Sequence, residues 1–240
     1  MTALELPAGG FLIGADSFSN DGDAEGHHGC PGGHRDFLIL RLDAKGAKIW
    51  TRSMGGTNHE YLSQIAATTD GAFVAYGRTE SADGDVHGFK GEYDAWAIKF
   101  DPTGQIIWDR TIGGSMWDWG SNVVATPDGG TILTGYFFSW YGDGAGNRGD
   151  YDYAAVKLNA RGEREWSRMF GGAHDDFAQG AVMLEDGSFL ISGGSVSDDG
   201  DVHENRGNFD LWLIRVSPNG ELLSSRTYGG SAYDISSPGG

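Results

Sequence analysis

The sequence predicts an all-β chain that folds as a four-bladed β-propeller with four antiparallel strands in each blade. The first observation is a block of 58 residues that occurs four times in succession. A fixed period of this size is typical of stacked or circular repeat architectures. The second is that each copy contains short apolar segments separated by turns, and the third is that no segment has the apolar period of a helix. Glycine pairs mark the repeat, at Gly55-Gly56, Gly113-Gly114, Gly171-Gly172 and Gly229-Gly230.

The copy that spans 61–118 shows the elements in order. Four strands are predicted in it, at 61–69, 72–80, 94–100 and 105–112. Asp70-Gly71 is a tight-turn pair that joins the first two strands into a hairpin. A loop rich in glycine and aspartate follows the second strand, and Pro102 and Gly104 turn the chain between the third and fourth. Such four-stranded units, repeated, describe the blades of a propeller.

Two columns of residues recur in register and predict packing between blades. Trp50, Trp108 and Trp166 follow the period, and Ser224 takes the fourth position. The second column is Leu38, Trp96, Ala154 and Trp212. One blade cannot bury its own apolar face, so we expect these side chains to pack against the neighbouring blade.

The four copies predict a single domain over 1–240. The blades are expected at about 2–56, 57–114, 115–172 and 173–230. Residues 231–237 align with the start of an innermost strand and Thr2 continues that alignment, so we expect 231–237 to close onto the first blade. Closure of the chain onto its own first blade favours a monomer, with a dimer as the alternative.

The repeat that runs from Asp94 to Ser115 has the form D-x-W-x-I-K-F-D-x-x-G-x-x-x-W-x-x-x-x-G-G-S. It resembles the β-propeller repeats of bacterial secreted and surface-attached proteins, and every copy in the chain carries a recognisable version. The resemblance implies a propeller frame, an extracellular or cell-surface location and a binding role. It supplies no catalytic residues.

The net charge of −17 argues against a nucleic-acid partner, because the phosphates would be repelled. There is no apolar run of transmembrane length and no signal-peptide pattern at the start of the sequence, so no membrane insertion is expected. The mature form of a secreted protein has this appearance, and a cytoplasmic location is the alternative. The one cysteine cannot form an internal disulfide.

All seven histidines fall in the long loops or in the linkers between copies, on one predicted face. The first copy has a four-residue insertion in its long loop that brings together His27, His28, Cys30 and His34. Imidazole and thiolate bind zinc, copper and iron. This loop is therefore a candidate transition-metal site, with a solvated loop as the alternative.

Paired aspartates in the long loops are candidate calcium ligands. Each pair flanks a glycine, as in Asp21 and Asp23, and again in Asp83 and Asp85. Calcium takes several oxygen ligands from flexible loops. The alternative is that these side chains cap backbone N–H groups in turns.

Aromatic side chains are concentrated in the third copy, where other copies have small or polar residues. We expect a ligand site there, with contributions from neighbouring loops and linkers. Its predicted residues are Trp117, Trp119, Trp140, Tyr141, His59, His87, Glu60 and Asp118. Aromatic walls beside acidic groups suit sugar rings and flat ligands. Alternatively the aromatics cover blade edges, and the recurrence of Glu60 and Asp118 once per copy favours a structural role for them.

These observations predict a ligand-binding module for a small molecule or glycan, lectin-like, with its site on the long-loop face. The alternative is a metal-dependent enzyme, a hydrolase or lyase, with histidine ligands and a carboxylate base on the same face. A second alternative is a structural segment of a bacterial surface protein. Whether the chain is an enzyme is left open. Calcium or a transition metal is the expected cofactor, and no organic cofactor is indicated.

Overall fold

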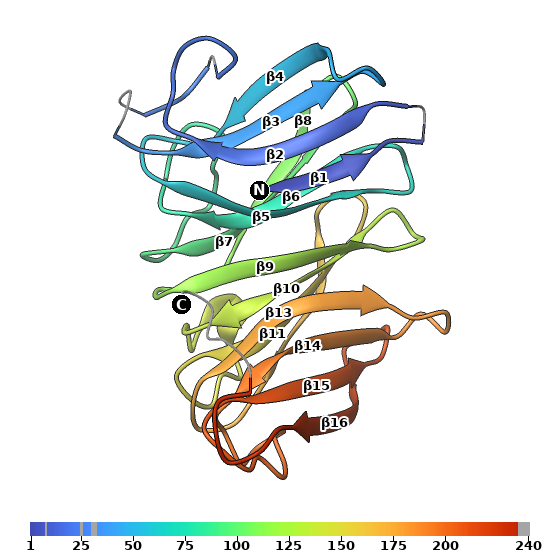
Figure 1. Cartoon of the computed structure of the whole chain (residues 1–240). Helices are drawn as coiled ribbons and strands as arrows, with labels where there is room; N and C mark the ends of the chain where they lie inside the picture. Colours follow the sequence, from blue (N-terminus) through green and yellow to red (C-terminus); the bar gives the residue numbers. More distant parts are fainter. Residues whose placement is uncertain (8, 25, 30–32, 235–240) are drawn as a thin grey trace.

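The computed structural model describes residues 1–240 except 8, 25, 30–32 and 235–240. It confirms the all-β prediction with four sheets of four strands (Figure 1). The first sheet holds β1 (Thr2–Glu5), β2 (Phe11–Ser17), β3 (Asp36–Leu42) and β4 (Lys48–Met54). The second holds β5 (Glu60–Ala67), β6 (Phe73–Thr79), β7 (Asp94–Phe100) and β8 (Ile106–Ile112).

The other two copies repeat this arrangement. The third sheet holds β9 (Asp118–Ala125), β10 (Thr131–Phe137), β11 (Asp152–Leu158) and β12 (Arg164–Phe170). The fourth holds β13 (Asp176–Met183), β14 (Phe189–Ser195), β15 (Asp210–Val216) and β16 (Leu222–Tyr228). The one helix of the described residues is the short 3-10 turn η1 (Gly142–Gly144), so none of them forms an apolar helix of membrane-spanning length.

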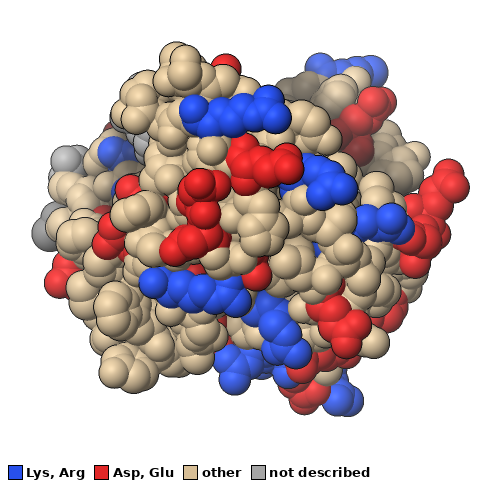
Figure 2. All heavy atoms as spheres, turned by 90° about the horizontal axis from the view of Figure 1, so that it is seen from below, with Lys and Arg blue, Asp and Glu red and all other residues tan. Residues whose placement is uncertain are grey.

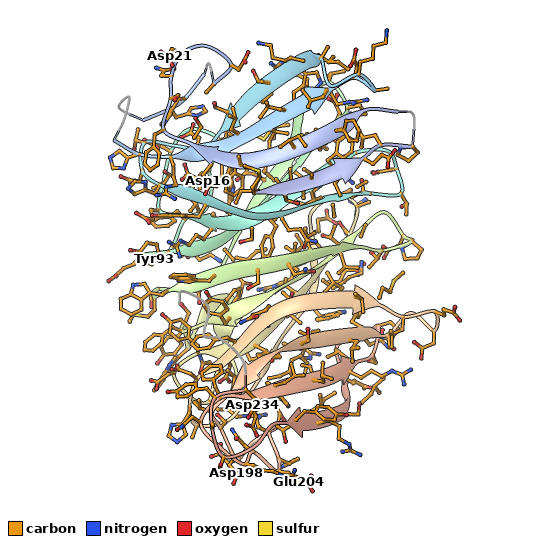
Figure 3. All side chains as sticks on the ribbon, in the orientation of Figure 1. Asp16, Asp21, Tyr93, Asp198, Glu204 and Asp234 are labelled. Carbon is orange, nitrogen blue, oxygen red and sulfur yellow. The ribbon has the colours of Figure 1, made fainter. Side chains whose placement is uncertain are left out.

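Each sheet is an antiparallel meander in which the strands follow sequence order. The long loops leave the sheets at the left of Figure 1, and the hairpin turns lie at the right. Residues such as Asp16 and Tyr93, labelled in Figure 3, lie at the long-loop end.

The innermost hairpins of three sheets share a bulge that is built around a glycine. In the second sheet the pairing of β5 with β6 shifts between Leu62 and Gln64. A Cβ at Gly77 would collide with the carbonyl oxygen of Tyr61, so only glycine permits this close approach. Gly135 and Gly193 stand in the same relation to the carbonyl oxygens of Trp119 and Phe177. A bulge re-aims side chains, and in these three innermost strands it lies beside an aromatic residue, Tyr61, Trp119 or Phe177.

Adjacent sheets are joined by the tryptophans of the two predicted columns and by Ala154, which confirms their role in packing. Leu38 is half-buried and Ser224 is exposed. The indole N–H of Trp50 donates to the carbonyl oxygen of Pro102 in the next sheet at 3.0 Å. Trp108 and Trp166 repeat this bond, to Ala160 at 3.1 Å and Pro218 at 2.9 Å. In the second column Trp96 packs on Phe37 of the first sheet, with ring centroids 4.9 Å apart. Trp212 packs on Tyr153 of the third sheet at 4.3 Å.

The four sheets of the described residues stand in an open row (Figure 1). Each innermost strand contacts its neighbour, β5 with β1, β9 with β5 and β13 with β9. No contact of that extent joins the first sheet to the fourth within the described residues. Strands β7 and β11 are buried along their whole length, whereas β3 and β15 keep partly exposed residues. The predicted closure onto the first blade depends on residues 235–237, which lie outside the described residues.

We predict that the tryptophan column carries measurable stability. Trp108→Phe removes the bond to Ala160 and part of the packed area, so the free energy of unfolding should fall by about 1–2 kcal/mol in a urea titration. The control is Ser224→Ala at the exposed fourth position, which should change it by less than about 0.5 kcal/mol. Equal effects at the two positions would show that the inter-sheet bond contributes nothing.

Candidate functional site

The linkers between sheets are held by buried carboxylates at the start of the next strand. Glu60 accepts the backbone N–H of Gly56 at 3.0 Å and the hydroxyl of Thr79 at 2.7 Å. Asp118 accepts the N–H of Gly114 at 2.7 Å. Both side chains are fully buried. The two carboxylates that the sequence predicted as ligand contacts are thus directed to the protein backbone, and Asp176 and Asp234 repeat the bond at 2.8 Å and 2.7 Å.

A second buried carboxylate meets the first at each linker. Asp152 accepts the N–H of Arg148 at 3.0 Å, and Asp94 and Asp210 make the same bond to their own loops. A Cβ at Gly171 would lie 2.5 Å from Asp152 Oδ1 and 2.6 Å from Asp176 Oδ2, so the two carboxylates share the space that a side chain would need. Burial raises the pKa of four of these groups to about 7, namely Glu60, Asp94, Asp152 and Asp176.

The histidines do not converge on one point. His27 and His28 both approach the carboxylate of Asp36, at 3.3 Å and 2.9 Å. His87 pairs with Asp109 of the outermost strand β8 at 2.9 Å. The predicted ligand His87 therefore lies with the outer part of the second sheet.

His34 lies against His59, with ring centroids 4.6 Å apart. The Nδ1 atom of His34 is buried and has no hydrogen-bond partner within the described residues. Cys30 lies outside the described residues. No group of three or more His, Cys, Asp or Glu side chains suited to a metal ion is found in the part of the chain that the structure describes.

The predicted calcium ligands are largely engaged with the linkers. Asp83 accepts the backbone N–H of Thr57 at 2.8 Å, and Asp85 accepts that of Gly55 at 3.3 Å. Asp23 pairs with Lys48, and Asp21 is exposed in the same loop. The four carboxylates are not brought together as a single set.

A cavity of about 400 Å³ opens where three innermost hairpins meet. It is lined by Tyr61, Ser63, Arg78, Trp119, Gly120, Ser121, Tyr136 and Gln179. These residues come from β5, β6, β9, β10 and β13, so the second, third and fourth sheets all contribute. Three of the wall residues are aromatic, and serine and glutamine side chains add hydrogen-bonding groups. Such a combination is typical of small-molecule and sugar sites.

The aromatic rings of the cavity belong to a continuous arc along the long-loop end of the sheets. Trp119 contacts Tyr136 at a centroid distance of 5.5 Å, and Tyr136 contacts Phe177 at 4.9 Å. Phe177 stacks on Phe209 with an interplanar angle of 10°. On another branch Tyr151 joins Tyr136 to Phe138, at 5.6 Å and 5.2 Å.

The remaining predicted aromatics lie at the outer end of this arc. Trp117 contacts Phe138 at 5.8 Å and donates its indole N–H to Glu92 at 2.6 Å. A smaller hollow of about 240 Å³ is lined by Ser115, Met116, Phe138, Trp140 and Tyr141. Trp140 and Tyr141 are exposed there. The structure thus connects the predicted aromatic residues through Phe138 and Tyr151, while Trp119 alone of them lines the larger cavity.

Sequence reasoning missed Tyr61, Arg78 and Tyr136 because they lie in strands. The sequence does mark Arg78, because the residue type at this position of the repeat differs in all four copies. The other copies have Asp16, Tyr136 and Gly194 there, so this position breaks the symmetry as strongly as any loop.

Figure 2 shows the face at the β16 end of the row, where acidic and basic side chains are scattered among uncharged residues. On this face the described residues form no continuous basic area that could follow a phosphate backbone. The pattern agrees with the excess of acidic residues in the chain, 34 against 17 basic ones.

Comparison with family models gives no match. A curated relative is the regulatory protein FlaEY of Caulobacter vibrioides, which is 23% identical over 190 residues. The match covers 74% of this chain and 20% of that protein, so this chain spans about a fifth of its relative's length.

Solved structures with some similarity include a protein of unknown function from Bacteroides caccae, with a TM-score of 0.45 and 13% identity over 81% of this chain and 55% of that one. A luciferin-regenerating enzyme gives a TM-score of 0.42 and 11% identity, over 91% and 59%. An apocarotenoid oxygenase from Synechocystis gives 0.40 and 15%, over 80% and 46%.

We predict that the linker carboxylates make the protein more stable at about pH 5 than at about pH 8. In the unfolded chain Glu60 titrates near 4.5, whereas burial raises its pKa to about 7 in the folded protein. The folded state therefore binds more protons between these values, and the stability this provides is lost as the pH rises through about 7. Urea titrations at both pH values measure the difference.

The matched variant for this prediction is Glu60→Gln, which is neutral at both pH values. The difference in unfolding free energy between about pH 5 and pH 8 should be smaller in the variant than in the parent protein, because one titrating group has been removed. An undiminished difference would show that Glu60 does not titrate in this range.

Proposed function

We propose that the protein is a binding module for a glycan, and that the cavity walled by Tyr61, Trp119 and Tyr136 is its site. The observation that carries the proposal is the cavity itself, about 400 Å³ in volume and formed by three sheets. Its aromatic walls match the C–H surfaces of a sugar ring. Ser121 supplies a hydroxyl group that suits the polar rim of a sugar. Ser63 donates its hydroxyl proton to the carbonyl oxygen of Gly120 at 2.7 Å, so its oxygen remains as an acceptor.

The hollow beside Trp140 and Tyr141 extends this proposal to a chain of several sugar units. Phe138 lines the hollow and also belongs to the aromatic arc that leads through Tyr151 to Tyr136. A glycan of several units can follow this arc along the long-loop end. The resemblance of the repeat to bacterial surface propellers supports the same reading, and we propose that the chain belongs to that group and acts in a secreted or surface-attached protein.

The binding function is better supported than the metal-dependent enzyme. His27 and His28 share Asp36, and His87 is paired with Asp109. Most of the predicted histidine ligands thus have protein partners outside the aromatic cavity.

Binding should be measured by screening an oligosaccharide array and titrating the hits by calorimetry. Trp119→Ala should weaken binding by about tenfold or more, because it removes one wall of the cavity. Tyr136→Phe retains the ring and should have a smaller effect. The controls are Lys45→Ala and Arg161→Ala at turns of the opposite face, which should leave the affinity unchanged. Equal losses from both faces, or no hits on the array, would refute the proposal.

A transition-metal site at the first long loop is a second proposal, and the adjacent rings of His34 and His59 favour it. We expect zinc to raise the melting temperature at about pH 7.5 but not at about pH 5, where protonated imidazole cannot bind metal. His34→Ala should remove the shift. A shift with calcium that persists at the lower pH would instead favour the carboxylates Asp21, Asp23, Asp83 and Asp85. No shift with either ion would refute both.

A further inference from the structure

Arg78 on β6 is held between two aromatic rings at the wall of the larger cavity. Its guanidinium carbon lies 3.9 Å from the ring centroid of Tyr61 and 3.7 Å from that of Trp119. Tyr93 approaches the same group at 5.3 Å. The guanidinium is therefore in close contact with aromatic rings, which stabilise a cation through their faces without accepting its N–H groups in ordinary hydrogen bonds.

Those donors have no partner in the described residues. No hydrogen bond or ion pair of the Arg78 side chain is found there, and its Nε atom is buried. The other described arginines that are at least partly buried each have a polar partner. Arg35 lies 3.8 Å from Asp16, Arg215 pairs with Asp186, and Arg41 donates to the backbone carbonyl oxygen of Gly9. Arg35 also has a buried Nε atom without a hydrogen-bond partner, but it has Asp16 beside it, whereas Arg78 has no carboxylate at ion-pair distance among the described residues.

None of the described residues that line the cavity with Arg78 is a carboxylate, in a chain with twice as many acidic as basic residues. The nearby Asp16 is engaged elsewhere, because it accepts the backbone N–H of Leu62 at 2.8 Å and faces Arg35. A partly buried cation with no carboxylate at ion-pair distance is unfavourable, and an anionic group supplied from outside would relieve this.

We propose that the ligand of this cavity is an acidic glycan, in which a hexuronic acid unit places its carboxylate against the edge of Arg78. The planar fork of a guanidinium matches a planar carboxylate with two parallel hydrogen bonds. The pyranose ring then lies along the aromatic walls, and its hydroxyl groups face Ser63 and Ser121. This inference rests on the proposed glycan-binding function and specifies its ligand class.

The experiment compares an oligogalacturonate with a neutral cello-oligosaccharide of equal length by calorimetric titration of the intact protein. We expect the acidic oligosaccharide to bind about tenfold to a hundredfold more tightly, as a charge-assisted pair requires. Added salt should reduce the preference, because the interaction is between charges at a partly open site.

Arg78→Met should bring the affinity for the acidic oligosaccharide down to that for the neutral one, and Arg78→Lys should retain part of the preference because it keeps the charge without the planar fork. The control is Arg52→Met, which removes another arginine that lies over a tryptophan, at 6.0 Å from Trp50, on an exposed strand. It should leave the preference unchanged. Melting curves establish that each variant is folded, and Arg78→Lys provides the comparison if the methionine variant is not.

Equal affinity for the two oligosaccharides in the parent protein would overturn this inference and leave the glycan-binding function standing. An acidic preference that survives Arg78→Met would overturn the assignment of the carboxylate to this arginine. Failure of every glycan to bind would instead refute the proposed function itself.

Discussion

The contact on which this fold depends is the bond from a buried carboxylate to the glycine pair between sheets. The linker lies outside the strand ladders, so its buried N–H groups need another acceptor. Glu60 provides it at one linker and Asp118 at the next. Because that acceptor is the first residue of the following strand, a single side chain both satisfies the linker and fixes where the next sheet begins. Repetition of this contact gives the sheets a constant relation to one another.

That contact also explains the glycine pair and the electrostatics around it. In the first, third and fourth sheets a second carboxylate, from the third strand, comes close to the same glycine, as Asp152 does at Gly171. There is no room for a side chain, and two acidic groups are buried together. Desolvation then raises the pKa of Asp152 to about 7. Buried carboxylates with raised pKa values thus lie at the linkers between sheets. The aromatic cavity is formed instead by residues within the strands of the innermost hairpins.

The repeat allowed much of the fold to be predicted, and the same regularity explains what was missed. The predicted strand at 94–100 coincides with β7, and the strand predicted at 61–69 corresponds to β5 at Glu60–Ala67. The repeat period gives the order of residues along a blade. It does not say whether a loop residue lies near the innermost or the outermost strand of that blade. His87 was therefore grouped with the cavity although it pairs with Asp109 on the outermost strand. Tyr61 and Arg78 were missed because strand positions were treated as packing.

Tyr61 and Trp119 both line the cavity and contact the guanidinium group of Arg78. The bulges at Gly77 and Gly135 orient Tyr61 and Trp119, and these two rings hold the guanidinium of Arg78 between them. Cation–π contacts offset part of the loss of hydration of that group without using its N–H donors. An ion pair within the protein would have stabilised the arginine as well, but it would have occupied those donors. Contact with the rings leaves the guanidinium of Arg78 without an ion pair among the described residues. In a chain of net charge −17, the described wall of this cavity therefore carries a cation and no carboxylate.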